Sequence, residues 1–253
     1  MIPDLARVAA IIREAAEAEV LPRFRNLTAA QIREKKPGQI VTEADTEAER
    51  FLARRLTELL PAAVVGEESV DADPDLLQAL ERPGPVWVID PVDGTANFAE
   101  GRARFAMIVA LVVDGSTRAG WIHDPVADRT VLAALGQGAW MGDSRLSVLP
   151  EGPLAEMAGS VKRKGPVAAR VASVGRKGSA AHDYLDLVTG RLHFAHFDRL
   201  MPWDHAAGVL IHAEAGGWSG LVDGRPYRPV AERGSLLLAP GPASWRELIE
   251  LVD

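Results

Sequence analysis

The chain has no cysteine, which excludes disulfide bonds, thiolate nucleophiles, and zinc or iron–sulfur centres held by thiolates. It also has no long apolar run, because the longest one, Phe105 to Val113, is far below the roughly 18 residues that a membrane span requires. Residues 1–20 mix acids and arginines in an amphipathic helical pattern that is unlike a signal peptide. We therefore expect a cytoplasmic protein that does not contact a membrane.

Basic residues are in the minority, since 28 lysines and arginines stand against 35 aspartates and glutamates, giving a net charge of −7 and a pI of about 5.5. Nucleic acid is therefore not an expected partner, because polyanion binding needs a basic surface. The acidic excess also has a specific interpretation, in which some carboxylates are gathered to hold cations. With 47% hydrophobic and 25% charged residues, the 253-residue chain has the composition of one globular domain or two packed halves.

The rhythm of the predicted elements changes near the middle of the chain. The first half opens with two helices, over 1–20 and from about 43 to Pro61, followed by short apolar strands over 86–89, 105–113, 119–123, 130–134 and 139–141. Turn-forming pairs such as Asp114-Gly115 separate these strands. An antiparallel meander is therefore expected in the N-terminal half.

In the second half helices and strands alternate, which is typical of an α/β layer. We predict helices over 179–189, 203–215 and 243–252, and strands over 192–197 and 236–239. The expected fold class is thus a mixture of α+β and α/β. We place the boundary between an N-terminal subdomain, residues 1–147, and a C-terminal subdomain, residues 148–253, close to Pro150 and Pro153.

Two aspartates that follow an apolar strand are the most informative local feature. In the segment 87–98 the strand delivers Asp90, Pro91 interrupts the pairing, and Asp93 follows on a turn together with Gly94 and Thr95. Two carboxylates at a strand end can bridge two magnesium ions, which prefer oxygen ligands. A single D-x-x-D-G motif is nevertheless more often an ordinary turn in which the second aspartate caps a helix.

Three further segments carry acids, and each has an ordinary structural explanation when it is taken alone. Gly66-Glu67-Glu68-Ser69 is compatible with a solvated turn. The segment Trp203 to Gly208 opens a helix, where Asp204 is favourable as a first-turn acid. The segment Val41 to Asp45 contains the T-x-x-D pattern of helix capping.

Taken together and in this order, these segments resemble the signatures of the inositol monophosphatase superfamily, over most of the chain. The resemblance implies a layered α-β-α-β-α sandwich, commonly a homodimer, that performs magnesium-dependent, lithium-sensitive hydrolysis of a small phosphate monoester. The physics agrees, since metal coordination lowers the pKa of water, and in-line phosphoryl transfer needs positioning and charge neutralisation more than covalent chemistry.

The resemblance also implies the ligands of the metal ions. Glu67, Asp90 and the backbone carbonyl of Val92 would hold one magnesium ion. Asp90, Asp93 and Asp204 would hold a second, and Glu67 would touch a third, weaker ion. Glu67 would thus be both a ligand and a member of the catalytic set.

For the rest of that set the resemblance implies Thr95 and Asp45, a pair that would orient and help to deprotonate the attacking water. Gly94 and Thr95 would supply N–H groups to the phosphate. Asp45 has the helix-capping alternative described above, and it could serve both purposes with different groups. Lys35 and Lys36 lie on an expected loop, where one of them would approach the metal site or both would form a solvated pair.

On the substrate side, Ser179 and Ala180 resemble the start of a helix that lines the family's substrate pocket, although a plain serine N-cap explains them equally well. Asp204 would also face the substrate. Members that bind inositol phosphate carry a glutamate ahead of the Trp-Asp pair, whereas here the nearest acid is Asp198. The substrate therefore stays open among inositol phosphate, histidinol phosphate, a sugar phosphate and a nucleotide 3′-phosphate. A regulatory or binding protein that keeps the fold is the alternative of a different class.

Overall fold

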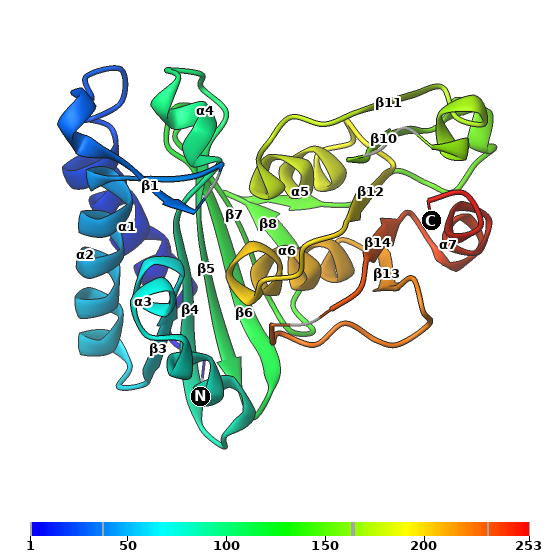
Figure 1. Ribbon diagram of the computed structural model, residues 1–253. Helices are drawn as coiled ribbons and strands as arrows, with labels where there is room; N and C mark the ends of the chain where they lie inside the picture. Colours follow the sequence, from blue (N-terminus) through cyan, green and yellow to red (C-terminus); the bar gives the residue numbers. More distant parts are fainter. Residues whose placement is uncertain (1, 37, 163–164, 232, 253) are drawn as a thin grey trace.

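The computed structural model describes residues 2–252 apart from residues 37, 163–164 and 232 (Figure 1). Its α-helices are α1 (Leu5–Ala15), α2 (Glu43–Leu59), α3 (Glu67–Ala72), α4 (Thr95–Ala99), α5 (Ala180–Val188), α6 (Pro202–Glu214) and α7 (Pro242–Ile249). A π-helical turn continues α1 over Ala16–Val20, and short 3-10 turns lie at Ala29–Gln31, Pro74–Glu81, Leu154–Glu156 and Pro166–Ala169.

The strands form a hairpin and two larger sheets. The hairpin joins β1 (Ile32–Lys36) to β2 (Gln39–Thr42). The seven-stranded sheet has sequential order, with β3 (Ala63–Gly66), β4 (Pro85–Asp93), β5 (Ala106–Val113), β6 (Ser116–Asp124), β7 (Arg129–Ala134), β8 (Ala139–Met141) and β9 (Ser144–Leu146). The five-stranded sheet has the order β11 (Ser173–Gly175), β10 (Ala158–Ser160), β12 (Phe194–Phe197), β14 (Leu236–Ala239) and β13 (Trp218–Leu221).

Helices and sheets are stacked in five layers (Figure 1). Helices α1 and α2 cover one face of the seven-stranded sheet, α5 and α6 lie between the two sheets, and α7 covers the far face of the five-stranded sheet. From β4 to β9 the larger sheet is antiparallel throughout. The predicted α-β-α-β-α sandwich with an N-terminal meander is therefore confirmed.

Strand β4 shows how the sequence builds these layers. Side chains alternate between the two faces of a strand, so Trp87 and Ile89 enter the core under α1 and α2, whereas Val86 and Val88 enter the core shared with α5 and α6. Both faces are covered, which explains why β4 is a continuous apolar run rather than an alternating one. The same strand carries Asp90 into the interior.

Helix α6 is buried between the sheets and approaches β6 very closely. Its small residues Ala206, Ala207 and Gly208 face crowded surroundings, and a Cβ atom added at Gly120 of β6 would lie 2.7 Å from Ala207 Cα. Small side chains on both elements allow this distance. The close approach brings the first turn of α6 next to the end of β4.

The structure differs from the expected elements at several places. Lys35 and Lys36 lie in β1 rather than on a loop. The turns over 74–81 and the short strands β9, β10, β11 and β13 have no predicted counterpart. The strands have only three or four residues, which show too little periodicity. Strand β4 continues to Asp93, with an irregular register between Asp90 and Asp93, where a proline interrupts the ladder.

The two sheets divide the chain near the expected boundary. The last strand of the larger sheet ends at Leu146, and the first of the smaller sheet begins at Ala158. We propose residues 1–147 and 148–253 as subdomains on this basis, although α5 and α6 of the second pack on the sheet of the first. In the described part of the chain, no helix is long and apolar enough to cross a membrane.

The contact between β6 and α6 gives a stability prediction. Gly120→Ala should destabilise the protein by roughly 1–3 kcal/mol, because the new methyl group meets backbone atoms of α6 that cannot move aside. The control is Gly175→Ala at the end of β11, where an added Cβ has no neighbour within 4 Å among the described residues. Urea unfolding should show a loss of stability for the first variant only, and equal stability for both would contradict the close packing.

Candidate active site

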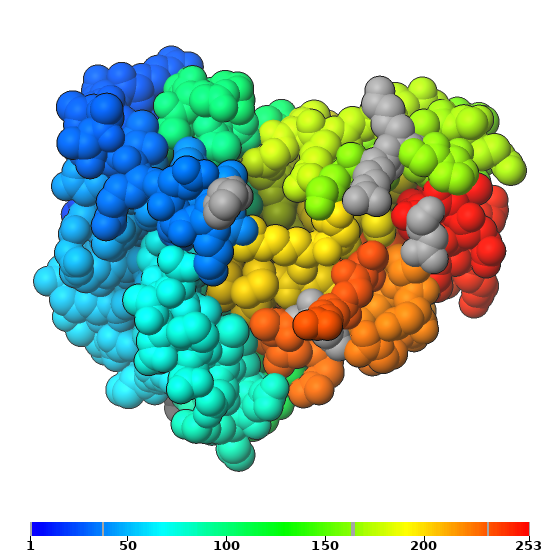
Figure 2. All heavy atoms as spheres, in the orientation of Figure 1, coloured from blue at the N-terminus to red at the C-terminus, as the bar shows by residue number. Residues whose placement is uncertain are grey.

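Four acidic side chains from three elements line one cleft of about 320 Å³. Glu67 is the first residue of α3, Asp90 and Asp93 belong to β4, and Asp204 lies in the first turn of α6. Strand β3 pairs in parallel with β4, so Glu67 and Asp90 leave neighbouring strand ends. Figure 2 shows the surface hollowed where the blue β1–β2 segment faces the yellow-green and yellow segments of the C-terminal half. The fold thus gathers carboxylates that are far apart in the sequence.

Glu67, Asp90 and Asp204 form the tightest part of this group, in which one oxygen of each lies within 4.8 Å of the others. Asp90 Oδ1 accepts the N–H of Val92 at 3.1 Å, whereas Oδ2 is buried and receives no hydrogen bond from any described residue. Burial, and then repulsion from neighbouring carboxylates, raises the pKa of Asp90 and Asp204 well above the ordinary value. Oxygen ligands, negative charge and an unsatisfied buried oxygen fit a hard divalent cation.

Asp93 is held differently, because its carboxylate is bound at the start of α5. Ser179 Oγ donates a short hydrogen bond to Oδ2, the N–H of Ala181 donates to Oδ2 at 2.8 Å, and the N–H of Ala180 donates to Oδ1 at 3.2 Å. Burial raises the pKa of Asp93 despite these donors. Ser179 also accepts from the N–H of His182 as the N-cap of α5. The serine therefore caps the helix and fixes Asp93 at the same time.

Asp45 serves two groups with its two oxygens. Its Oδ2 accepts from the N–H and the hydroxyl of Thr42 at 2.8 and 2.6 Å, which completes the capping box of α2. Its Oδ1 lies 3.1 Å from Thr95 Oγ1, which also lies 3.0 Å from the carbonyl oxygen of Val92. Burial raises the pKa of Asp45 to about 6. Both interpretations of the T-x-x-D segment are therefore compatible with one side chain.

Of the two candidate lysines, Lys35 is the one that reaches the cleft. Its Nζ lies 2.6 Å from Glu68 and 3.5 Å from Glu67, and its side chain is 8% exposed. Burial alone would lower the pKa of Lys35, but these two carboxylates outweigh it and raise the value. Lys36 instead pairs with Asp71 and is 67% exposed. Lys35 therefore places a fixed positive charge beside Glu67.

Glu49 of α2 has a supporting role that the sequence does not reveal by itself. It is buried, and its carboxylate accepts the N–H groups of Glu68 at 2.7 Å and Ser69 at 2.9 Å, together with the hydroxyl of Ser69. These bonds satisfy the first donors of α3 and fix the turn that carries Glu67. The sequence gives one indication of this role, because Glu49 is an acid that lies one helical turn after Asp45, on the buried side of an amphipathic helix.

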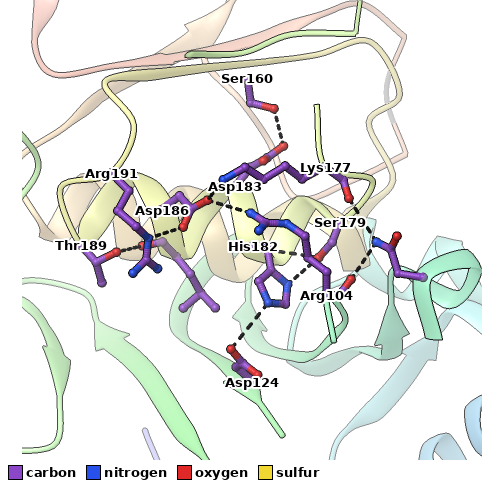
Figure 3. Close-up of polar contacts among 12 residues, drawn as sticks. Arg104, Asp124, Ser160, Lys177, Ser179, His182, Asp183, Asp186, Thr189 and Arg191 are labelled. Atoms are coloured by element: carbon purple, nitrogen blue, oxygen red, sulfur yellow. Dashed lines mark hydrogen bonds and ion pairs between the residues drawn. The ribbon is translucent and has the colours of Figure 1, made fainter. Parts of the chain in front are cut away.

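Helix α5 is anchored behind the cleft by a second line of polar contacts (Figure 3). His182 lies between Ser179 and Asp124, with Nδ1 3.0 Å from Ser179 Oγ and Nε2 3.5 Å from Asp124 Oδ2. Although burial raises it, the hydrogen bonds from His182 and from the N–H of Ala127 hold the pKa of Asp124 at about 2. His182 thus links the N-cap serine to a carboxylate at the end of β6.

The remainder of α5 is fixed in the same way. Asp183 Oδ2 accepts from Ser160 Oγ at 2.7 Å, and the nearly buried Asp186 is bound by three cations, Arg104, Lys177 and Arg191 (Figure 3). Together with the contact between His182 and Asp124, these contacts tie the helix to both sheets and to the neighbouring loops. A rigid α5 keeps the donors of its first turn on Asp93.

Asp198 lines the cleft, as do Gly94, Thr95, Ser179 and Ala180. Its Oδ2 is 2.7 Å from Lys162 Nζ, and this ion pair holds the pKa of Asp198 below the ordinary value, against the effect of burial. At Gly94, φ is +90° and an added Cβ would lie 2.8 Å from the carbonyl oxygen of Arg104, so the position requires glycine. The predicted phosphate and substrate residues therefore border the same cavity as the carboxylates.

The contacts of His182 give a second prediction. His182→Leu should lower the free energy of unfolding by roughly 1–3 kcal/mol, because the ring no longer satisfies two buried polar neighbours. His182→Asn is the matched control, since its amide can still form a hydrogen bond with Ser179, and it should lose less. Urea unfolding of the metal-free protein measures both, and a leucine variant as stable as the wild type would refute the supporting role.

Comparison with known proteins agrees with this geometry. The chain matches the model of the inositol monophosphatase family over residues 4–252. It is 31% identical to the inositol-1-monophosphatase of Bacillus subtilis over 212 residues, 76% of each chain. It is 34% identical over 194 residues, 73% of each chain, to the Thermotoga maritima protein named fructose-1,6-bisphosphatase/inositol-1-monophosphatase. A solved IMPase of Thermotoga maritima is similar with a TM-score of 0.84 at 27% identity, over 97% of this chain and 95% of the other. The chain therefore belongs to the inositol monophosphatase family, and its reaction is the metal-dependent hydrolysis of a phosphate monoester.

Proposed function

We propose that magnesium is the metal of this phosphatase and that two ions are held by Glu67, Asp90, Asp93, Asp204 and the backbone carbonyl of Val92. The observation that carries this proposal is the buried Asp90 Oδ2, which has no donor among the described residues while two further carboxylates lie within 4.8 Å. A buried, unpaired charge is costly unless it coordinates a cation. The three bonds on Asp93 support a carboxylate of fixed orientation beside this group.

Magnesium bound there would supply charge neutralisation and a lowered pKa for water. The chain itself supplies orientation. Thr42 holds Asp45, Asp45 Oδ1 accepts from the hydroxyl of Thr95, and Thr95 borders the cleft beside Asp90. We assign Thr95 and Asp45 to the positioning and deprotonation of the attacking water, together with Glu67. The two roles of Asp45 do not conflict, because one oxygen caps α2 and the other faces Thr95.

The phosphate is assigned to Gly94 and Thr95, where glycine leaves room for a close approach to the backbone. The leaving group is assigned to Ser179, Ala180, Asp198 and Asp204, which border the same cavity. The substrate is a small phosphorylated metabolite. The name of the Thermotoga maritima relative joins two phosphatase activities, so membership of the family does not by itself choose one ester.

Four further features of the proposal have the family resemblance as their support. They are inhibition by lithium, a third and weaker magnesium ion that contacts Glu67, assembly as a homodimer, and location in the cytoplasm. Lithium inhibition would be seen in how the hydrolysis rate depends on the lithium concentration, and the third ion in how it depends on the magnesium concentration.

Metal dependence is the direct test. Hydrolysis of phosphate esters should require magnesium and stop in excess chelator. Magnesium at a hundredfold excess over its dissociation constant should stabilise the fold by about 2.7 kcal/mol. Asp90→Asn should abolish both effects and leave the metal-free protein at least as stable, because an amide relieves the repulsion around Asp90 Oδ2.

The matched control for that variant is Asp143→Asn, which removes the same charge from an exposed position. It should keep magnesium-dependent activity and the thermal shift. Full activity of the wild type in chelator would rule out the metal mechanism. A thermal shift by magnesium that survives in Asp90→Asn would instead remove Asp90 from the metal site.

Asp198 gives a prediction about the leaving group. Loss of a charged hydrogen bond to a substrate hydroxyl costs about 1.5–3 kcal/mol, or roughly 10- to 150-fold in kcat/KM. Asp198→Ala should therefore impair hydrolysis of a hydroxylated ester, such as fructose 1-phosphate, more than that of phenyl phosphate. Equal kcat/KM ratios for the two esters in wild type and variant would mean that Asp198 serves only the exposed ion pair with Lys162, which contributes little.

A further inference from the structure

A line of polar contacts leads from the end of β6 to the cleft, and Figure 3 shows its outer part, from Asp124 to Ser179. His182 of α5 lies between Asp124 and Ser179, and Ser179 in turn contacts Asp93. All four residues are buried, and Asp93 is the most exposed of them at 8%. The line therefore connects a carboxylate of the proposed metal site to a histidine that the proposed mechanism does not use.

The hydroxyl of Ser179 has a single hydrogen, whose direction is set by its neighbours. An Asp93 that ligates a cation is ionised and only accepts hydrogen bonds, so it takes this hydrogen on Oδ2. The serine oxygen accepts the backbone N–H of His182 at 3.2 Å. His182 Nδ1 also lies 3.0 Å from this oxygen. Because the serine hydrogen is already used, this last contact is favourable only where Nδ1 carries a hydrogen and donates it to Ser179.

The second ring nitrogen of His182 faces a carboxylate. Its Nε2 lies 3.5 Å from Asp124 Oδ2, and Asp124, whose pKa is about 2, is ionised at neutral pH. Arg129 donates to the same oxygen at 3.0 Å, and the N–H of Ala127 donates to Oδ1 at 3.1 Å. An ionised carboxylate cannot donate, so the contact with Nε2 also requires a hydrogen on the ring. A histidine with hydrogen on both nitrogens is a cation, and Asp124 is its counter-ion.

Serine, histidine and aspartate are also the residue types of the nucleophilic triad in serine hydrolases, where the histidine removes the serine hydrogen. The direction of the hydrogen bonds argues against that role in this chain. The hydrogen of Ser179 goes to Asp93, and the ring of His182 donates to Ser179 instead of accepting from it. Ser179 is also only 5% exposed. The line of contacts therefore serves Asp93 and not an attack by the serine on a substrate.

The direction of this hydroxyl decides which oxygen of Asp93 is available to a cation. A carboxylate has about four lone-pair sites, two on each oxygen. Ser179 and the N–H of Ala181 use both sites of Oδ2, whereas the N–H of Ala180 uses one site of Oδ1. One site therefore remains, and it is on Oδ1. If Nδ1 of His182 had no hydrogen, it would attract the serine hydrogen away from Oδ2, and each oxygen of Asp93 would then have one open site.

We infer that His182 is a positioning residue, whose two ring nitrogens both donate hydrogen bonds and hold the Ser179 hydroxyl on Asp93 Oδ2, so that Oδ1 is the oxygen offered to magnesium. The inference rests on the proposed function, because it concerns how the chain orients one of the proposed metal ligands. Removal of a group that orients a metal ligand typically costs roughly 10- to 100-fold in metal affinity or activity. His182 acts on Asp93 only through Ser179, so its own effect is smaller than that of the serine.

The hydrogens of the ring can be observed directly. The six histidines are labelled with nitrogen-15, and the signals of their ring nitrogens are recorded by NMR at neutral pH with saturating magnesium. The signals of His182 are those that are missing from the spectrum of His182→Asn. Both should be of the protonated type, whereas His205, whose pKa burial lowers to about 4, should show one protonated and one unprotonated nitrogen. An unprotonated nitrogen on His182 would overturn the inference.

Magnesium affinity, measured by titration calorimetry, tests the consequence for the metal site. Ser179→Ala should weaken binding roughly 10- to 100-fold, and His182→Leu by a smaller factor of roughly threefold or more. His182→Asn should lose less, since its amide can still donate to Ser179. The double variant with Ser179→Ala and His182→Leu should bind no more weakly than Ser179→Ala alone, because the histidine acts through the serine. His193→Asn is the control, since that ring contacts the N–H of Ala158 and does not line the cleft, and it should bind magnesium like the wild type.

The outcomes separate this inference from the proposed function. If His182→Leu binds magnesium as tightly as the wild type, or if the losses of the two single variants multiply in the double variant, the positioning role is wrong while the proposed function stands. If the leucine variant does not fold, the ring signals of the wild type and the affinity of the asparagine variant decide in its place. If the wild type binds no magnesium, the proposed function fails and this inference fails with it.

Discussion

Electrostatic repulsion among carboxylates at the end of β4 is the constraint on which the rest of the site depends. Burial and neighbouring charges raise the pKa of Asp90 and Asp204 well above the ordinary value, so without a cation these groups work against the folded state. The surrounding layers must therefore supply compensating stability. They do so through apolar burial on both faces of the larger sheet and through hydrogen-bond donors that contact the carboxylates at the end of β4.

Different elements of the fold supply these donors. Lys35 supplies a charge beside Glu67, Glu49 satisfies the first N–H groups of α3, and the start of α5 holds Asp93. The last contact crosses between the two halves of the chain, because Asp93 belongs to the larger sheet and α5 to the second half. The site therefore exists only when the two halves are packed together, and a boundary at residue 147 marks a change of sheet rather than independent units.

Long elements and short motifs could be predicted from the sequence for a physical reason, since periodicity and spacing are local. The helix after Thr42, the apolar run of β5 and the order of the acidic segments are of this kind. The role of His182 could not be predicted, because it depends on Asp124 from another layer. Neither could the partner of Asp198, because Lys162 follows a strand of only three residues.

The two ends of the cleft are formed by different parts of the fold, and this difference bears on how the substrate specificity of such a phosphatase can change. The inner end is made by β4 and by the first turns of α3 and α6, whose packing leaves little freedom to change. The outer end is made by residues just beyond β10, β11 and β12, on connections that tolerate substitution more readily. Substitutions on these connections leave the packing of β4, α3 and α6 in place, so that one hydrolytic centre can serve different esters.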